Sequence, residues 1–208
     1  MFPGMRLYMN PYSANARRAH MTAIQLGIDH EDVVVDLAKR DHKAPGFLAM
    51  NPNGRVPVLV DGDFVLTESH AIMTYLADKA GDDALYPRAP QARADVHRWL
   101  FWNANHFQPA VSVLNFERIV KTIRGLGAPD PNEVARGESL VREFAGVLDQ
   151  HLATRTWLSQ DRLTLADLAV ATPFQSRVPA KLPLDGFPHI EAWLARMQDL
   201  ACWKKTAL

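Results

Sequence analysis

The sequence has a single cysteine, no long hydrophobic run and no excess of charge of either sign. One cysteine, Cys202, excludes an internal disulfide, a clustered thiolate zinc site and a CxxC redox pair, and it favours a reducing, cytoplasmic location. Lysine plus arginine number 23, as do aspartate plus glutamate, so no global field attracts nucleic acid or an anionic membrane. No stretch approaches the roughly 18 apolar residues of a membrane span, and the first residues lack the apolar core of a signal peptide. We therefore expect a soluble protein without nucleic-acid or membrane partners.

The remaining composition is that of an ordinary globular protein. Apolar residues make up 48% of the 208 and charged residues 22%, which is far from the composition of disordered chains. The length predicts one or two compact units.

The first 80 residues read as alternating strands and helices. Residues 6–10 are strand-like, Ser13 stands where a helix N-cap belongs, good helix formers follow to Gly27, and residues 32–37 are β-branched. This order predicts a βαβ unit with parallel strands. Apolar runs at 56–60 and 64–66 flank an Asp-Gly pair, which is a strong hairpin signal, and a helix is expected over 69–79. The pattern predicts a four-stranded mixed sheet in a domain of residues 1–80.

The character of the chain changes after this domain. Residues 81–91 mix glycine, proline and acids without periodicity, which is typical of a linker. From 92 to 208 only helical patterns occur. A first helix, in which Pro109 should introduce a kink, is expected after Ala92, and others over 132–152, from Thr164 and after Pro188. Five residues at helical spacing are expected to face the core of this all-helical domain: Leu100, Ala104, Phe107, Val111 and Leu114.

Several residues in the first domain are candidates for binding chemistry. Ser13 is favoured as a plain N-cap, yet the same position would place its hydroxyl beside the positive end of a helix, where a thiolate is stabilised. Glu68 followed by Ser69 is read first as a solvated acid and a helix cap, and alternatively as a pair that holds the ammonium and carboxylate of an amino acid.

A second group of candidates surrounds the Val56-Pro57 bond. If that bond is cis, the backbone of Val56 would offer strand-like hydrogen bonds to a peptide ligand, although cis is the minority form of X–Pro bonds. His42, Lys43 and Arg55 are read either as surface charge or as a trio that holds a carboxylate. Together the candidates fit a short anionic peptide with an amino acid head and a central thiol.

The segments NPYSANARR and DHKAPGFLAMNPNGRVPVLVDGDFVLTES, followed by a helical half, resemble a bacterial, serine-type (phi- or theta-like) member of the cytosolic glutathione transferase superfamily. The resemblance implies a thioredoxin-like N-terminal domain of βαβ-ββα order and an all-α C-terminal domain. It implies that Ser13 activates the glutathione thiol. His42, Lys43 and Arg55 would hold the glycyl carboxylate, Val56 with Pro57 would clamp the cysteinyl moiety, and Glu68 with Ser69 would form the γ-glutamyl pocket.

The sequence departs from other classes of the superfamily. The cysteine of the beta class would fall at Ala14, so mixed-disulfide chemistry of that class has no thiol here. Tyr8 and Tyr12 remain rivals of Ser13 as the hydroxyl that activates the thiol. The family's capping box matches Thr164 with Asp167, which we interpret as structural.

A second pocket for the other substrate should come mainly from the helical half. We expect a stripe of Trp99, Asn103 and His106 to face it, with further walls from Tyr12, Phe116 and Trp203; the alternative, at least as strong, is that Trp99 is core packing and His106 a surface histidine. No metal site is expected.

The function implied by the resemblance is conjugation of the glutathione thiolate to small hydrophobic electrophiles, with glutathione as co-substrate and a homodimer as the assembly. Two alternatives stay open: a glutathione-dependent peroxidase or dehalogenase, and a module of the same fold that binds glutathione or apolar ligands without turnover.

Overall fold

The computed structural model describes residues 4–207, which form two compact units. The first unit runs to Arg88 and takes in the chain again from Gln198; the second is Ala89–Met197. The boundary falls inside the segment predicted as a linker. The last residues of the chain, predicted to belong to the helical domain of 92–208, are grouped instead with the first unit.

The first unit is built on a four-stranded sheet in the order β2-β1-β3-β4. Strand β1 (Met5–Met9) pairs in parallel with β2 (Glu31–Val34) and antiparallel with β3 (Val58–Asp61). The predicted hairpin is confirmed: β3 pairs with β4 (Phe64–Thr67) across a two-residue loop, and Gly62 in that loop has the positive φ of 60° that its first position requires.

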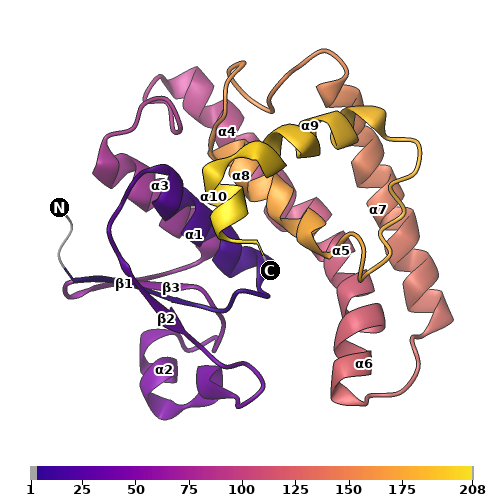
Figure 1. Cartoon of the computed structure of the whole chain (residues 1–208), viewed down its shortest axis with the longest axis horizontal. Coiled ribbons are helices and arrows are strands. Elements are labelled where there is room, and N and C mark those ends of the chain that lie inside the picture. Colours follow the sequence, from indigo (N-terminus) through magenta and orange to yellow (C-terminus); the bar gives the residue numbers. More distant parts are fainter. Residues whose placement is uncertain (1–3, 208) are drawn as a thin grey trace. The chain divides into compact units, whose positions relative to one another are not determined.

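Helices cover both faces of this sheet. On β1, Met5, Leu7 and Met9 are buried and alternate with side chains that point to the opposite face. Helices α1 (Ala14–Gln25) and α3 (Ser69–Ala80) pack against each other and the sheet. Helix α2 (Pro45–Met50) lies on the other side of the sheet in Figure 1. Its Phe47 packs edge-on against Tyr8, with the ring centroids 6.4 Å apart.

The short elements between β2 and β3 were not predicted. The segment between these strands, for which the sequence predicted no helix or strand, contains a 3₁₀ turn, η1 (Asp41–Lys43), and α2, which begins with a proline. Only Phe47 of α2 is buried, so this segment shows too little apolar periodicity to be recognised as a helix.

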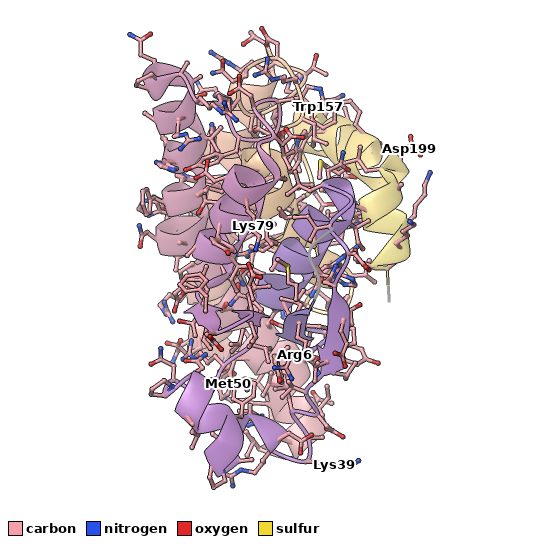
Figure 2. The ribbon with its side chains drawn as sticks, turned by 90° about the vertical axis from the view of Figure 1, so that its left-hand side faces the viewer. Arg6, Lys39, Met50, Lys79, Trp157 and Asp199 are labelled. Atoms are coloured by element: carbon pink, nitrogen blue, oxygen red, sulfur yellow. The ribbon has the colours of Figure 1, made fainter. Side chains whose placement is uncertain are left out.

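A polar contact ties the end of β3 to α3. The carboxylate of Asp61 accepts a hydrogen bond from the Tyr75 hydroxyl (2.5 Å) and pairs with the Lys79 ammonium; the Lys79 side chain can be located in Figure 2. These contacts lower the pKa of Asp61, first through its bond with Lys79 and then through its bond with Tyr75.

The second unit is helical throughout. A continuous helical run comprises α4 (Pro90–Trp102), a π-helix η2 (Asn103–Phe107), α5 (Gln108–Asn115), a second π-helix η3 (Phe116–Val120) and α6 (Lys121–Arg124). It is followed by α7 (Pro131–Leu152), α8 (Leu165–Ala171), η4 (Thr172–Ser176) and α9 (Pro188–Asp199), while α10 (Ala201–Lys205) belongs to the first unit. Among residues 4–207, no helix combines the length and apolar character that crossing a bilayer demands.

The π-helices change which residues face the core. Four of the five predicted core positions are buried, but Ala104 is exposed and its neighbour Asn103 is buried instead. The extra residue in a π-turn shifts the helical register by one position. The π-turn also precedes Pro109, whose missing N–H falls at the start of α5, where a helix tolerates it.

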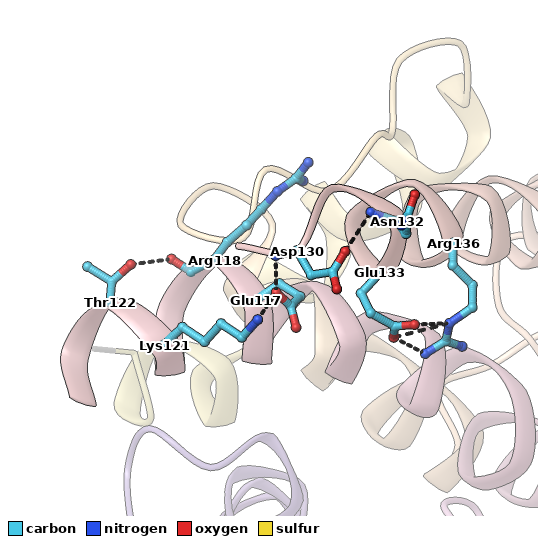
Figure 3. Close-up of polar contacts among 8 residues, drawn as sticks. All are labelled: Glu117, Arg118, Lys121, Thr122, Asp130, Asn132, Glu133 and Arg136. Atoms are coloured by element: carbon cyan, nitrogen blue, oxygen red, sulfur yellow. Dashed lines mark hydrogen bonds and ion pairs between the residues drawn. The ribbon is translucent and has the colours of Figure 1, made fainter. Parts of the chain in front are cut away.

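Two polar networks fix helix ends in this unit. The predicted capping box of Thr164 and Asp167 is confirmed at the start of α8, and the Asp167 carboxylate also accepts hydrogen bonds from Leu158 N and Trp193 Nε1, both at 3.0 Å. Figure 3 shows the second network, in which buried Glu117 accepts from Lys121 Nζ (2.6 Å) and from the backbone N–H of Asp130 (2.7 Å). It links η3 to the start of α7.

Candidate active site

A tight turn places Ser13 at the start of α1. The side-chain amide of Asn10 donates to the Val35 carbonyl (3.0 Å) and accepts from Tyr12 N (3.0 Å). The backbone carbonyl of Asn10 accepts from Ser13 N (3.0 Å). Asn10 is buried, so the turn is anchored to the chain beyond β2. The sequence analysis did not assign Asn10 a role, although Asn-Pro is a recognised turn signal.

Ser13 is the N-cap of α1, as the plainer reading of the sequence predicted. Its backbone is extended (φ −86°, ψ 115°) and its hydroxyl oxygen accepts from Ala16 N at 3.3 Å. A hydroxyl can accept with one lone pair and donate its own proton at the same time. The cap and a hydrogen bond donated to an anion are therefore compatible. The first turn of α1 carries no acidic residue that would oppose an anion.

A second loop faces this turn and is shaped by Asn51 and Gly54. Buried Asn51 donates from Nδ2 to the Arg55 carbonyl (2.7 Å) and accepts from Asn53 N (3.1 Å). Gly54 has a φ of 57°, and a Cβ at this position would lie 2.8 Å from the carbonyl oxygen of His42. Only glycine permits this approach without displacing the backbone. Sequence reasoning missed both residues, although the Asn-Pro-Asn-Gly run is a turn signal.

The two loops enclose a hollow of about 320 Å³ in the first unit. Its described lining residues are Ser13, Asn15, Leu37, His42, Lys43, Gly54, Arg55 and Val56. Of these eight, Ser13 alone carries a hydroxyl, and three are basic. The structure thus brings together five residues that the sequence singled out, while Asn15, Leu37 and Gly54 were not foreseen. The Val56-Pro57 bond is cis.

Glu68 and Ser69 lie at the start of α3 and are not among the described residues that line this hollow. The expected cap is wrong: Glu68 occupies the N-cap position and Ser69 is the first helical residue. Glu68 has a φ of 67°, a conformation that costs a non-glycine residue about 1–3 kcal/mol and is concentrated at functional sites.

Beneath the start of α3 lies a buried arginine that the sequence analysis did not anticipate. Arg18 Nη1 donates to Ser69 Oγ (3.4 Å) and to His70 Nε2 (3.1 Å). Burial lowers the pKa of Arg18 to about 9, and burial together with the charge of Arg18 lowers the pKa of His70 to about 3. His70 is therefore neutral and accepts a hydrogen bond from Arg18, and this contact holds α3 to α1.

The stripe predicted to face a second pocket does not form. Trp99 and Asn103 are buried, whereas His106 is exposed and its ring lies 5.3 Å from that of Phe144. The ring of Trp99 packs against that of His151 within the helical unit, with the ring centroids 4.6 Å apart. The alternative that Trp99 is core packing is therefore confirmed. The π-turn separates the three side chains, because it removes the regular spacing on which the stripe depended.

The three remaining candidates for pocket walls lie in different surroundings. Tyr12 is 76% exposed and Phe116 is 46% exposed. Trp203 is buried, with the Arg17 guanidinium 4.0 Å above its ring. For Tyr12 and for Phe116, contact with the second substrate stays a prediction.

The helical unit has a hollow of its own that the sequence did not indicate. It measures about 550 Å³ and lies between the end of η4 and the start of α9. Apolar side chains, among them Val178, Leu182 and Phe187, form its walls together with Arg177 and Glu191, which are paired at 3.1 Å. None of the residues proposed for substrate binding lines it.

A four-stranded mixed sheet with helices on both faces, followed by an all-helical unit, has the architecture of a thioredoxin-like domain joined to a helical domain. Comparison with known proteins agrees. The family model described as the glutathione S-transferase N-terminal domain matches residues 3–78, and that of the C-terminal domain matches residues 107–200.

Individual relatives span almost the whole chain. Glutathione S-transferase 3 of Zea mays is 37% identical over 97% of this chain and 92% of its own length, and human glutathione S-transferase theta-2B is 32% identical over 94% and 81%. Among solved structures, the chain resembles a theta class glutathione S-transferase from the citrus canker pathogen Xanthomonas axonopodis pv. citri, which has glutathione bound. The two sequences are 28% identical, and the structures superimpose with a TM-score of 0.89 over 99% of this chain and 98% of that one.

The chain belongs to the glutathione S-transferase family. It is an enzyme that conjugates glutathione, its co-substrate.

Proposed function

We propose that the enzyme activates glutathione through Ser13 and transfers the thiolate to a small hydrophobic electrophile. One observation carries this proposal: among the described residues that line the basic hollow, Ser13 is the one whose side chain bears a hydroxyl. Lys43 and Arg55 supply positive charge for the glycyl carboxylate of the tripeptide, and His42 supplies a ring N–H that can donate to it.

The energy required is modest. A free thiol has a pKa of about 8.5, and lowering it to about 7 requires roughly 2 kcal/mol in favour of the thiolate. A hydrogen bond to a charged group contributes about 1.5–3 kcal/mol, and the positive end of a helix about 0.3–1 kcal/mol. The Ser13 hydroxyl at the start of the twelve-residue α1 therefore suffices without a general base.

The transfer itself follows from nucleophilic chemistry. The thiol proton leaves to solvent, the thiolate sulfur forms a bond to the electrophilic carbon, and the leaving group departs with its electron pair. The protein contributes by holding the thiolate and the carbon close together. No metal takes part in this scheme.

The proposal predicts that Ser13→Ala raises the pKa of bound glutathione by about 1–2 units, because the hydrogen bond to sulfur is lost. The ultraviolet absorbance of the thiolate, titrated in the complex, measures this pKa. The same loss should lower kcat/KM about 10- to 150-fold, with little change in glutathione affinity.

Three variants control for other effects of this change. Alanine also removes the N-cap, at a cost of about 0.5–2 kcal/mol, whereas Ser13→Gly removes the hydroxyl and costs the cap only a few tenths. Both should raise the thiol pKa equally, and Ser13→Thr should preserve it. Glu68→Ala should instead weaken glutathione binding without shifting the pKa, because its carboxylate would act at the far end of the tripeptide.

Other results would redirect the proposal. A thiol pKa unchanged in Ser13→Ala would move the role to Tyr8, Tyr12 or a backbone N–H. Tyr8 and Tyr12 are not among the described residues that line the hollow, so Tyr8→Phe and Tyr12→Phe should leave the titration intact.

The acceptor, the assembly and the location extend the proposal further. We assign the enzyme a small hydrophobic electrophile, with the exposed ring of Tyr12, next to Ser13 in the sequence, available to contact it, a homodimeric state and a cytoplasmic location. The last two rest on the family resemblance. Light scattering of the purified chain tests the dimer, and a panel of halides, enones and peroxides identifies the acceptor.

A further inference from the structure

Two histidines and an aspartate meet between α1 and β2. His20 lies in the second half of α1, His30 precedes β2 and Asp32 belongs to it. His20 Nε2 is 3.1 Å from Asp32 Oδ2, and His30 Nε2 is 3.3 Å from Asp32 Oδ1. None of the three is among the described lining residues of the basic hollow.

The tautomer of His30 leaves two lone pairs facing each other. His30 Nδ1 lies 2.8 Å from the Ile28 carbonyl, which can only accept, so Nδ1 carries the proton. In the neutral ring Nε2 then has a free lone pair, directed at a carboxylate oxygen. The His30 side chain is 9% exposed, and its Nε2 is buried without a hydrogen-bond partner among residues 4–207. Two such acceptors approach each other favourably only with a proton or a metal ion between them.

The spacing suits a metal ion. Zinc binds imidazole nitrogen at about 2.0–2.1 Å and carboxylate oxygen at about 2.0–2.2 Å, so tetrahedral angles separate neighbouring ligand atoms by roughly 3.3 Å. Both nitrogen–oxygen distances in the cluster are close to this value. The ligand atoms of all three residues lie within 4.8 Å of one another, so small side-chain rotations complete the set.

We propose that His20, His30 and Asp32 bind one divalent transition metal ion of the zinc class. Two imidazoles and one carboxylate are donors that zinc accepts readily. The hydrogen bond from His30 Nδ1 to a backbone carbonyl is the contact that usually orients a metal-binding histidine. The Asp32 side chain is 40% exposed, so the ion has a path from solvent and a water molecule can fill its fourth position.

The two imidazoles reach the same carboxylate from different elements, His20 from α1 and His30 from the residue before β2. The ion would join the middle of α1 to β2, which is an edge strand of the sheet. Binding would therefore stabilise the first unit.

Metal titration of the untagged, chelator-treated protein tests the site. Glutathione must be omitted, because its thiol binds zinc. Calorimetry with ZnCl₂ should show one ion per chain, and Co²⁺ should give the visible bands of tetrahedral coordination. Asp32→Asn and His30→Gln should each weaken zinc binding by at least about tenfold.

Matched controls separate this site from adventitious binding. His189→Gln removes an exposed histidine and Cys202→Ala removes the buried thiol; both variants should bind zinc as the unmodified protein does. Zinc should also raise the thermal unfolding midpoint of these controls but not that of Asp32→Asn. Equal zinc affinity, or an equal rise in midpoint, in Asp32→Asn would overturn the proposal, as would zinc binding lost in His189→Gln or Cys202→Ala.

Discussion

Two glycines of α7 offer a matched test of how closely the helices of the second unit pack. At Gly137 a Cβ would lie 2.9 Å from Leu114 Cδ2 and 3.0 Å from Val113 Cγ1, both on α5. At Gly146 the nearest atom, Phe187 Cε1, is 4.0 Å away. The same substitution, Gly→Ala, thus meets a crowded interface at one position and ordinary contact at the other.

The expected magnitudes follow from these distances. Alanine gains about 1 kcal/mol over glycine in a helix interior, and this gain is common to both sites. Carbon atoms in ordinary contact are about 3.5–4.0 Å apart, so a methyl group at Gly137 must displace its neighbours by roughly half an ångström. Overpacking of this kind costs about 1–3 kcal/mol. Gly146→Ala should stabilise the protein by about 1 kcal/mol, and Gly137→Ala should be about 1–3 kcal/mol less stable than Gly146→Ala.

Urea unfolding followed by circular dichroism measures this difference, with all variants at one protein concentration because assembly affects apparent stability. A double-mutant cycle adds a second test. Leu114→Ala alone should cost about 2–5 kcal/mol. In that background Gly137→Ala should be less harmful by about 0.5–3 kcal/mol, since most of the crowding atoms are gone. Equal stabilities of Gly137→Ala and Gly146→Ala would refute the close approach of α5 and α7.

Two further predictions concern the first unit. His70 binds a proton below about pH 6.5 in the unfolded chain but stays neutral in the folded one, so lowering the pH from 6.5 to 5 should cost up to about 2 kcal/mol of stability. The urea midpoint of His70→Gln should therefore fall less steeply over this range than that of the unmodified protein. Parallel curves would contradict a neutral His70 beside Arg18. Asn51→Ala loses the hydrogen bonds to Arg55 and Asn53, so the free energy of unfolding should fall by about 2 kcal/mol and the affinity for glutathione, measured by calorimetry, severalfold. Asn51→Asp should keep the bond to Asn53. Unchanged affinity in Asn51→Ala would mean that this loop does not contact the tripeptide.

Features encoded by neighbouring residues could be predicted from the sequence. The Ser13 cap, the hairpin at Gly62 and the box of Thr164 with Asp167 depend on side chains and backbone within a few residues of each other. Their chemistry is visible in a short segment. The parallel pairing of β1 with β2 also followed from the order of elements.

Features that depend on a change of helical period could not be predicted. Nothing in the residues around Asn103 distinguishes a π-turn from an α-helix except the nearby Pro109, which was interpreted as a kink. The regular period then assigned Ala104 to the core and grouped Trp99 with His106. One extra residue in a turn was enough to invalidate both inferences.

Long-range polar contacts were also beyond the sequence. Arg17 and Arg18 are adjacent charged residues in a helical segment, where charge is normally solvated. Both are buried, because acceptors from residues far along the chain reach them: Thr206 for Arg17 and Ser69 for Arg18. Asn10 and Asn51 carried turn signals, but their partners across the loops could be identified only in three dimensions.

The return of the chain terminus to α1 limits how this protein can be dissected. Helix α10 packs beside α1 (Figure 1), where Thr206 Oγ1 accepts from Arg17 Nε at 3.1 Å and the Trp203 ring lies under the guanidinium. A fragment that ended at Arg88 would lack Trp203, so the Arg17 guanidinium would lose its ring contact. The side of α1 that α10 covers would then be exposed to solvent. An autonomous sheet fragment would thus need the final dozen or so residues grafted back, for example through a circular permutation.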